Sequence, residues 1–480
     1  MNRKKNKEKK NSPQIMVITV SFTLLFLSMI GYITYYSVTH KQELINNSYN
    51  GRQQMLLSQN RRGSIYSADG KILAQTVTSE NGDDVREYPY GNLFSHAVGY
   101  ATNGRMGVEA QANYYLINSN APLSKKAALE ASGEKYPGDD VYTTLDTELQ
   151  QVASTALGVY RGAIVVTQPS SGRILAMVSK PDFDPGTVAA NWDELRSDSQ
   201  KGVLLNRVTQ GLYPPGSTFK IVTALEYVRE NPDTYQQYTY QCNGSISRGD
   251  GRIQCYHGSV HGQIGFTRSF AKSCNSSFAN MGLTFDRNHF EETLDRLLFN
   301  QKLPLSMNYS QSRVDMNDTI SDADMMQVSI GQGTTAMSPI HLNMITSAIA
   351  NDGGLMKPYI VDHVENSAGT SIKNFNAAAY GNLMTEEEAS TLAGLMTDVV
   401  EEGTASRLKG LSYTAAGKTG SAEYGTVKGD SHAWFTGFAP AEDPEICVTI
   451  IIEGAGAGGD YAVPIAKRIF DAYFGVEAIY

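Results

Sequence analysis

The sequence predicts an α+β fold, and three features of its strand pattern support this class. Residues 163–167 (AIVVT) and 174–178 (ILAMV) are strand-like, and the Pro-Ser-Ser-Gly segment between them is typical of a turn, so they predict an antiparallel hairpin. Residues 433–437 and 446–453 are again strand-like, near the C-terminus, and the chain between these pairs contains a long helical stretch. Strands at both ends of a helical region predict one central antiparallel sheet flanked by helices.

Two further helices and a smaller module complete the predicted fold. A helix is expected from Thr147, with Asp146 as its N-cap, and another over residues 463–474. The GAGAGG run near Gly456 is expected to be a flexible loop. Residues 39–150 mix short strand-like stretches with turn signals, so we expect a small β-rich module in front of the main domain.

An uncharged apolar run near the N-terminus predicts a membrane-spanning helix. Residues 15–38 contain no charged side chain, and the run exceeds the roughly 20 residues that a helix needs to cross hydrocarbon. Basic side chains precede it and Tyr32, Tyr35 and Tyr36 end it, which matches an anchor whose N-terminus is cytoplasmic. The alternatives are a buried core helix and a cleaved signal peptide, but the run is too long for the latter and no small-residue cleavage site follows.

The chain is therefore expected to divide into four parts. These are a cytoplasmic basic tail (1–14), a transmembrane anchor (15–38), a membrane-proximal pedestal (39–150) and a main domain outside the cytoplasm (151–480).

Composition excludes nucleic acid as a partner. The formal net charge is −9, and the basic tail is the only strong cluster of Lys and Arg. Polyanion binding requires such clusters on the folded domain. Hydrophobic residues make up 41% of the chain and charged residues 19%, which is enough apolar material for a large core.

Four cysteines give no disulfide framework. Cys242 and Cys255 flank a glycine-rich loop, so a bridge between them and a free pair both remain open. With His257 and His261 they also offer ligands for zinc, but the spacing matches no common metal pattern and we expect no metal site. Cys274 and Cys447 are expected to be small buried hydrophobic residues, and no metal or organic cofactor is required for the chemistry described below.

Ser217 and Lys220 form a candidate nucleophile and base. Pro214, Pro215 and Gly216 predict a turn into a helix that starts at Ser217. Residues three apart lie on the same helix face, so the lysine amine is expected near the serine hydroxyl. Burial of that amine would lower its pKa enough to accept the serine proton. A capping serine and a solvated lysine are the alternative explanation of this spacing.

Two later strings supply the remaining polar groups of such a site. The Ser273 hydroxyl can relay a proton between Lys220 and a leaving amine, and the Asn275 amide can bind a substrate peptide group. In Lys418-Thr419-Gly420-Ser421 the hydroxyls and the ammonium group can bind a carboxylate, and glycine permits close approach of a ligand backbone. Each string alone is also typical of an ordinary turn.

The order of these three strings resembles that of penicillin-binding proteins and serine β-lactamases. The chain is most similar to a monofunctional, class B penicillin-binding protein, a peptidoglycan D,D-transpeptidase, over nearly its whole length. Further matching strings are Arg62-Gly63, Asp69-Gly70, Leu73-Ala74, Gly107-Val108-Glu109, Gly331-Gln332-Gly333, Ser338-Pro339, Glu402-Gly403-Thr404-Ala405 and Trp434-Phe435-Thr436-Gly437-Phe438.

The resemblance implies a transpeptidase fold, a mechanism and partners. Ser217 would attack the penultimate D-Ala carbonyl of a stem peptide, D-Ala would leave, and a neighbouring amine would complete a crosslink. β-Lactams would acylate the same serine. The family also implies a polytopic glycosyltransferase of the shape, elongation, division and sporulation class as partner. We expect the protein in the cell membrane of a Gram-positive-type bacterium. A serine β-lactamase, a β-lactam sensor and a catalytically silent division scaffold are the alternatives.

Overall fold

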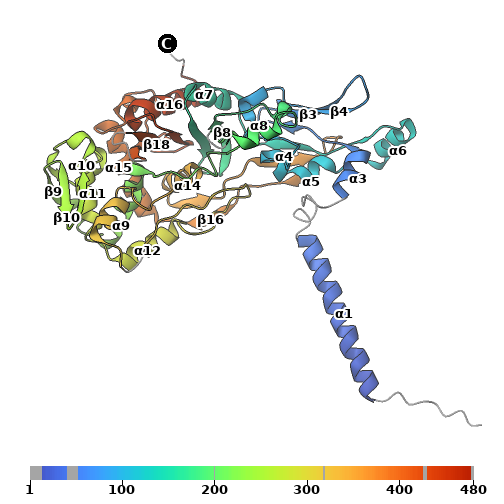
Figure 1. The fold of residues 1–480 in the computed structure, drawn as a ribbon, viewed down its shortest axis with the longest axis horizontal. Helices are drawn as coiled ribbons and strands as arrows, with labels where there is room; N and C mark the ends of the chain where they lie inside the picture. Colours follow the sequence, from blue (N-terminus) through green and yellow to red (C-terminus); the bar gives the residue numbers. More distant parts are fainter. Residues whose placement is uncertain (1–12, 40–51, 199–200, 317–318, 425–429, 477–480) are drawn as a thin grey trace, which may run out of the picture.

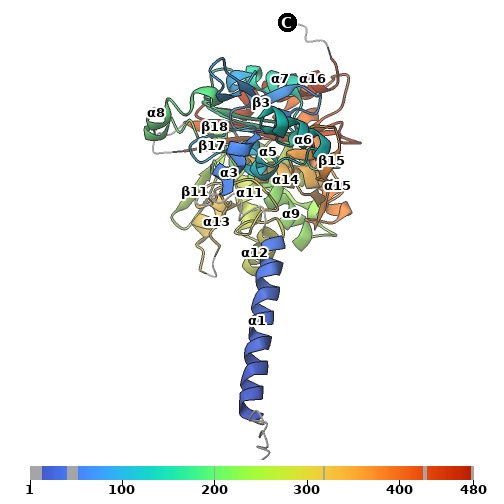
Figure 2. The ribbon, with the colours of Figure 1, turned by 90° about the vertical axis from the view of Figure 1, so that its right-hand side faces the viewer.

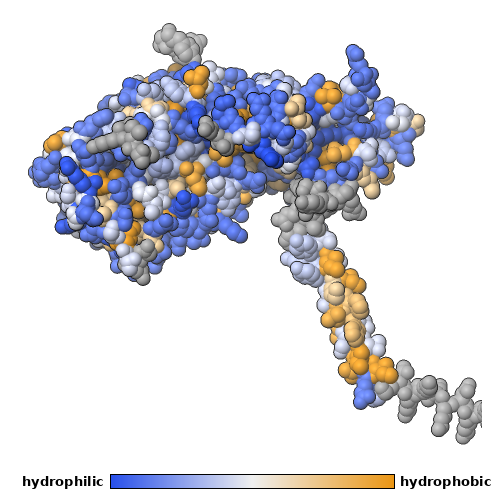
Figure 3. Space-filling view, in the orientation of Figure 1, coloured by the Kyte–Doolittle hydropathy of each residue, from blue (hydrophilic) through white to orange (hydrophobic). Residues whose placement is uncertain are grey.

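The structure is a computed structural model that describes residues 13–39, 52–198, 201–316, 319–424 and 430–476 (Figure 1). Most of the predicted basic tail, residues 1–12, lies outside the described residues. The first element is α1 (Pro13–Thr39), a helix of 27 residues with no buried side chain. It extends away from the folded body, and apolar side chains cover much of its surface (Figure 3). By length and composition it is the one helix of the described chain that is apolar enough to cross a membrane.

A five-stranded sheet forms the centre of the body and confirms the α+β class. Its strand order is β17-β18-β19-β7-β8, and every neighbouring pair is antiparallel. The predicted hairpin is present as β7 and β8, and both predicted C-terminal strands join it. The strands are β7 (Gly162–Gln168), β8 (Arg173–Lys180), β17 (Ala416–Glu423), β18 (Ser431–Ala439) and β19 (Ile446–Ile452).

Helices cover both faces of this sheet (Figure 1). On one face α7 (Thr147–Leu157) packs beside α16 (Gly458–Tyr473), and on the other lies α14 (Pro339–Ile349). Asp146 caps α7 as predicted, because its side chain accepts a hydrogen bond from the Leu149 amide at 2.8 Å. The long α15 (Glu386–Glu401) packs against the edge strand β17. The side chains on both faces of the sheet are therefore shielded from water.

The closing helix starts earlier than the sequence indicates. Gly458 and Gly459, expected in a flexible loop, form the first turn of α16. A Cβ at Gly458 would lie 2.2 Å from the Trp434 carbonyl oxygen and 2.5 Å from that of Gly420. Close packing against β17 and β18 thus fixes two residues with poor intrinsic helix propensity.

A helix-rich region lies beside the edge strand β17, at the end of the body far from α1 (Figure 1). It begins with the short 3₁₀ turn η3 (Gly216–Phe219), which leads into α9. Its other elements are α9 (Lys220–Glu230), β9 (Thr239–Cys242), β10 (Ser245–Arg248), β11 (Gly251–Gln254), β12 (Gly262–Gly265), α10 (Phe266–Ala271), α11 (Asn275–Gly282), α12 (Arg287–Arg296) and α13 (Asp322–Val328).

A second sheet lies at the end of the body next to α1, above that helix in Figure 2. Its order is β15-β14-β6-β2-β3-β4, so two strands from late in the chain complete a module expected from residues 39–150. The strands are β2 (Ile65–Tyr66), β3 (Ile72–Thr78), β4 (Asp84–Glu87), β6 (Asp140–Thr143), β14 (Val361–Glu365) and β15 (Ser371–Asn374). Around them lie α3 (Arg52–Gln59), α4 (Gly107–Gln111), α5 (Asn113–Ile117) and α6 (Leu123–Ser132), and α8 (Trp192–Ser197) follows β8.

One cluster of buried charged side chains links several segments of this module. Glu109 is completely buried, and its carboxylate lies 2.5 Å from Arg62 and 2.7 Å from Arg86. Burial alone would raise the pKa of Glu109, but the two guanidinium groups outweigh it and lower the pKa. The carboxylate therefore ties three segments of the pedestal together.

Candidate active site

The turn that carries Ser217 is a 3₁₀ turn rather than the first turn of an α-helix. Ser217 lies in η3, and α9 starts three residues later at Lys220. Two contacts hold the turn in place. The Gly216 amide donates to the Gly331 carbonyl at 2.9 Å, and the Trp434 indole donates to the Pro214 carbonyl at 3.1 Å.

Lys220 is completely buried, and its amine meets three residues of the predicted site. Nζ lies 3.1 Å from the Ser217 hydroxyl, 2.7 Å from the Ser273 carbonyl oxygen and 2.7 Å from the Asn275 amide oxygen. Burial lowers the pKa of Lys220 to about 7. A large neutral fraction of this amine therefore exists near neutral pH, next to a serine hydroxyl.

Ser273 joins the two lysines of the site. Its hydroxyl lies 3.2 Å from Lys220 Nζ and 2.9 Å from Lys418 Nζ. The residue has φ = 56°, a left-handed conformation that non-glycine residues rarely adopt. Burial and the charge of Lys220 hold the pKa of Lys418 well below its usual value. The strained turn thus places one hydroxyl between two buried amines.

Alternate residues of strand β17 face the cleft and the protein interior. Thr419 and Ser421 line a cleft beside Ser217, and Thr419 Oγ1 lies 2.5 Å from Thr404 Oγ1. Gly420 faces the protein instead, where a Cβ would lie 3.0 Å from each of Pro215 O, Thr218 Cγ2 and Trp434 Cβ. The space expected for a ligand backbone at Gly420 is therefore filled by η3 and β18.

The cleft has a volume of about 490 Å³ and contains groups that the sequence did not single out. Its further residues come from the segment between β11 and β12, from the residue after α10, from the loop after α15 and from the N-terminal end of α16. These additional lining residues are Tyr256, Ser259, His261, Lys272, Thr404, Ser406, Arg407, Ala457, Gly459 and Asp460. Some of these positions are marked in the sequence for other reasons: Thr404 in the Glu402-Gly403-Thr404-Ala405 string, His261 as a possible zinc ligand, and Ala457 and Gly459 in the glycine-rich run.

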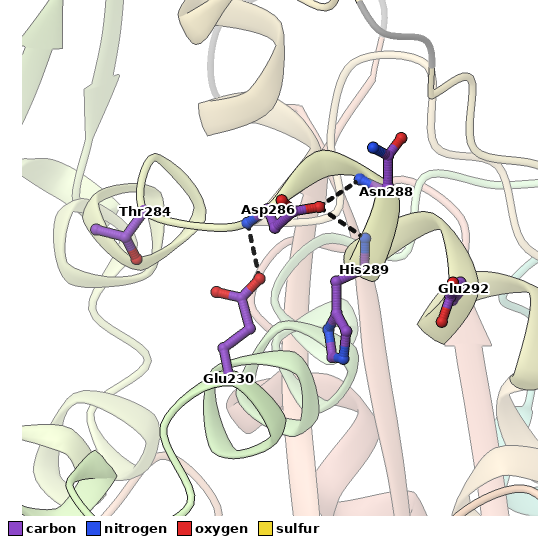
Figure 4. Close-up of a pocket in the computed structure, with 6 residues that line it drawn as sticks. All are labelled: Glu230, Thr284, Asp286, Asn288, His289 and Glu292. Atoms are coloured by element: carbon purple, nitrogen blue, oxygen red, sulfur yellow. Dashed lines mark hydrogen bonds between the residues drawn. The ribbon is translucent and has the colours of Figure 1, made fainter.

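A second pocket, of about 560 Å³, shares no lining residue with the cleft (Figure 4). Its polar groups are used to hold helix α12. Asp286 accepts hydrogen bonds from the Asn288 and His289 amides, and Glu230 accepts one from the Asp286 amide at 2.7 Å. His289 lies 2.7 Å from the buried Glu226. These contacts make the pocket a capping arrangement rather than a catalytic centre.

All four cysteines are free, and three of them are neighbours. Sγ of Cys255 lies 3.7 Å from Sγ of Cys242 and 3.7 Å from Sγ of Cys274. Cys274 is buried as predicted, in a small hydrophobic cluster that also contains Cys242, Cys255 and Ile264. Cys447 lies in β19, within hydrogen-bonding distance of Asn343.

Of the two histidines near the cysteines, His261 contacts a cysteine sulfur and His257 does not belong to the cluster. Nδ1 of His261 lies 3.3 Å from the Cys242 sulfur. His257, also considered from the sequence, is not part of the group, because its left-handed backbone turns the ring against Tyr256 at 4.1 Å between centroids.

Comparisons with known proteins agree with this architecture. The family model for the penicillin binding protein transpeptidase domain matches residues 162–471, and that for the penicillin binding protein A dimerisation domain matches residues 62–141. Peptidoglycan D,D-transpeptidase PbpA of Mycolicibacterium smegmatis is 29% identical over 450 residues, which cover 88% of this chain and 91% of that protein.

Two solved structures are also similar. The D,D-transpeptidase domain of a peptidoglycan glycosyltransferase from Eggerthella lenta is 28% identical, with a TM-score of 0.78 over 88% of this chain and 100% of that one. The ceftriaxone acyl-enzyme complex of penicillin-binding protein A from M. tuberculosis is 25% identical, with a TM-score of 0.80. The match covers 88% of this chain and 99% of that one.

The chain belongs to the penicillin-binding protein transpeptidase family, since the transpeptidase model matches more than half of it. The dimerisation domain in front of the transpeptidase domain agrees with the resemblance to class B members, which is confirmed.

Proposed function

We propose that this chain is a peptidoglycan D,D-transpeptidase whose nucleophile is Ser217. One observation carries the assignment: a completely buried lysine amine lies 3.1 Å from the Ser217 hydroxyl. Ser217 Oγ forms a bond to the carbonyl carbon of the penultimate D-Ala while Lys220 accepts its proton. The amide bond to the terminal D-Ala then breaks, and Ser273 passes a proton to the departing amine.

The other polar groups bind substrate in this scheme. Asn275 binds the peptide group of the stem, and Lys418, Thr419 and Ser421 bind its terminal carboxylate. Backbone amides of Ser217 and Ser421 stabilise the oxyanion, and each such donor is typically worth about 3 kcal/mol. Gly420 contributes by letting η3 pack against β17. An amine from a second stem peptide attacks the acyl-enzyme and forms the crosslink, and a β-lactam acylates Ser217 in place of the stem.

The basic and apolar segments near the N-terminus support a cellular arrangement for this enzyme. Residues 1–14 form a cytoplasmic tail, 15–38 the anchor, 39–150 most of the pedestal and 151–480 the transpeptidase domain outside the cytoplasm. The basic side chains before α1 support this orientation. A polytopic glycosyltransferase of the shape, elongation, division and sporulation class, contacted through α1 and the pedestal, supplies the glycan strands in a Gram-positive-type cell wall.

Two assays test the proposed function. Fluorescent penicillin is expected to label the detergent-solubilised full chain persistently and not to label Ser217→Ala, whereas β-lactam turnover would indicate a β-lactamase. With lipid-linked precursor and a polymerase partner, wild type is expected to form crosslinked product that releases D-Ala. Labelling without any crosslinking would favour a sensor or a scaffold.

A further inference from the structure

Three cysteines and one histidine bring their ligand atoms together behind the Ser273 turn. The sulfurs of Cys242, Cys255 and Cys274 and a ring nitrogen of His261 all lie within 4.8 Å of one another. The three cysteines are buried, and His261 is partly exposed where it lines the cleft.

The spacing of these atoms matches tetrahedral zinc. With Zn–S near 2.3 Å and Zn–N near 2.0–2.1 Å, ligand atoms around one ion are separated by about 3.8 Å for two sulfurs and about 3.6 Å for sulfur and nitrogen. Three of the six separations here are 3.7 Å, 3.7 Å and 3.3 Å, and the other three are no more than 4.8 Å. A disulfide instead requires about 2.05 Å between sulfurs. The separations agree with ligation far better than with a bridge.

Four short segments deliver the ligands. Cys242 ends β9, Cys255 follows β11, and Cys274 lies between α10 and α11. Pairing of β9 with β12 sets Cys242 opposite Gly262, next to His261. The backbone pairing thus fixes two of the four ligands without any metal, which makes the group a built site rather than a chance cluster.

A serine hydroxyl also contacts two of these sulfur atoms. The Ser276 hydroxyl donates to Cys242 Sγ at 3.2 Å and lies 3.3 Å from Cys255 Sγ. Hydroxyl donors of this kind orient and stabilise metal-bound thiolates.

We propose that Cys242, Cys255, Cys274 and His261 bind one structural Zn²⁺ ion. Four protein ligands leave no open position, so the ion takes no part in acyl transfer. The ion instead fixes the position of the Ser273 turn. Cys274 stands between Ser273 and Asn275, two of the three residues that the Lys220 amine contacts, so the ion clamps the left-handed Ser273 turn against the buried amine. Binding releases the thiol protons to solvent. The inference about metal binding does not depend on the proposed function.

Metal analysis of the full-length protein tests the site directly. Protein purified in detergent with a reductant and Zn²⁺ is expected to contain about one zinc per chain by mass spectrometry of the metal. Cys242→Ser and His261→Gln are expected to bind zinc at least about tenfold more weakly. Cys447→Ser is the matched control, because Cys447 is buried far along the chain in β19, and it is expected to keep the metal.

Cobalt supplies a spectroscopic readout that is independent of catalytic activity. Exchange of Zn²⁺ for Co²⁺ in wild type and in Cys447→Ser is expected to give thiolate-to-metal charge-transfer bands and the visible bands of tetrahedral Co²⁺. Wild-type protein with less than about a tenth of a metal ion per chain, or a disulfide among Cys242, Cys255 and Cys274 in the reduced preparation, overturns the proposal.

The positional role has its own test. Removal of zinc from wild type by a chelator is expected to slow penicillin acylation at least about tenfold, and added Zn²⁺ is expected to restore it. Equal rates with and without the metal would refute the clamp. Ser217→Ala is expected to retain zinc, so failure of the metal site and failure of the proposed function remain distinguishable.

Discussion

At the scale of single residues, the arrangement of two lysines around one serine hydroxyl determines the chemistry. Lys220 and Lys418 both approach Ser273, and both are buried. Two ammonium groups in such a place repel each other and lack water, so a neutral amine is favoured. Ser273 adopts a strained backbone φ to make these contacts. The helices α10 and α11 on either side of Ser273 hold its backbone in this conformation.

The pKa of Lys220 predicts how acylation depends on pH. Because burial lowers this pKa to about 7, the neutral form grows as the pH rises through that value. The second-order rate of penicillin acylation is expected to rise about tenfold between pH 6 and pH 8 and then to level off. Stopped-flow measurement with a coloured cephalosporin gives the profile. A flat profile, or one that falls in this range, would contradict a lysine base.

Lys220→Ala removes the proposed base. The rate of acylation is expected to fall by about 10²–10⁴ while the circular dichroism spectrum stays that of wild type. Lys409→Ala is the control, since Lys409 is exposed and pairs with Glu401 at the surface, and it is expected to react normally. An unfolded Lys220→Ala protein would indicate a structural lysine instead.

Sequence spacing predicts contacts within one helix but not contacts between segments. The three-residue interval placed Lys220 beside Ser217 because both lie at the start of the same helical stretch. The packing role of Gly420 and the position of Cys274 among other sulfurs depend on strands and loops that meet only after folding. No local pattern could indicate them.

At the scale of elements, the contact between η3 and β17 sets the position of the nucleophile. Gly420→Ala is expected to lower the free energy of unfolding by about 1–3 kcal/mol and to slow acylation, because the new methyl group would press on Pro215, Thr218 and Trp434. Chemical denaturation and acylation rates measure both effects.

Gly394→Ala is the matched control for this substitution. Gly394 lies within α15, and a Cβ there would have no atom within 4 Å. The change is expected to raise the free energy of unfolding by about 0.5–1 kcal/mol and to leave acylation unchanged. Equal behaviour of the two variants would show that β17 does not need a glycine against η3.

The sequence predicts an element correctly where turn or capping residues mark its ends. The β7–β8 hairpin and the capped start of α7 follow from turn and capping residues, and both are present. The first turn of α16 was assigned to a loop, because glycine has low helix propensity and only packing against β17 and β18 stabilises it.

At the scale of the whole molecule, the sheet next to α1 is assembled from strands that lie far apart in the sequence. Strands β14 and β15 come from residues 361–374, yet β14 pairs with β6 on one side and with β15 on the other, so this sheet contains segments from both parts of the chain. A single sequence carries no signal for pairing between such distant strands. Movement of the pedestal is therefore expected to be transmitted to the catalytic domain.

Glu109→Ala tests the charge cluster that stabilises the pedestal. Two buried guanidinium groups would lose their counter-charge, so we expect a loss of about 3–5 kcal/mol in the free energy of unfolding. Glu134→Ala, at an exposed position of the same module, is expected to be neutral. Thermal unfolding compares them, and a small effect of Glu109→Ala would mean that Arg62 and Arg86 find other partners.

The most direct measurement is a crystal structure of the protein soaked with penicillin. We expect continuous density from Ser217 Oγ to the opened lactam carbonyl, with the drug carboxylate near Lys418, Thr419 and Ser421 and Lys220 still within reach of Ser217. Density for the drug on any other side chain, or a carboxylate turned away from β17, would contradict the assignment of this cleft.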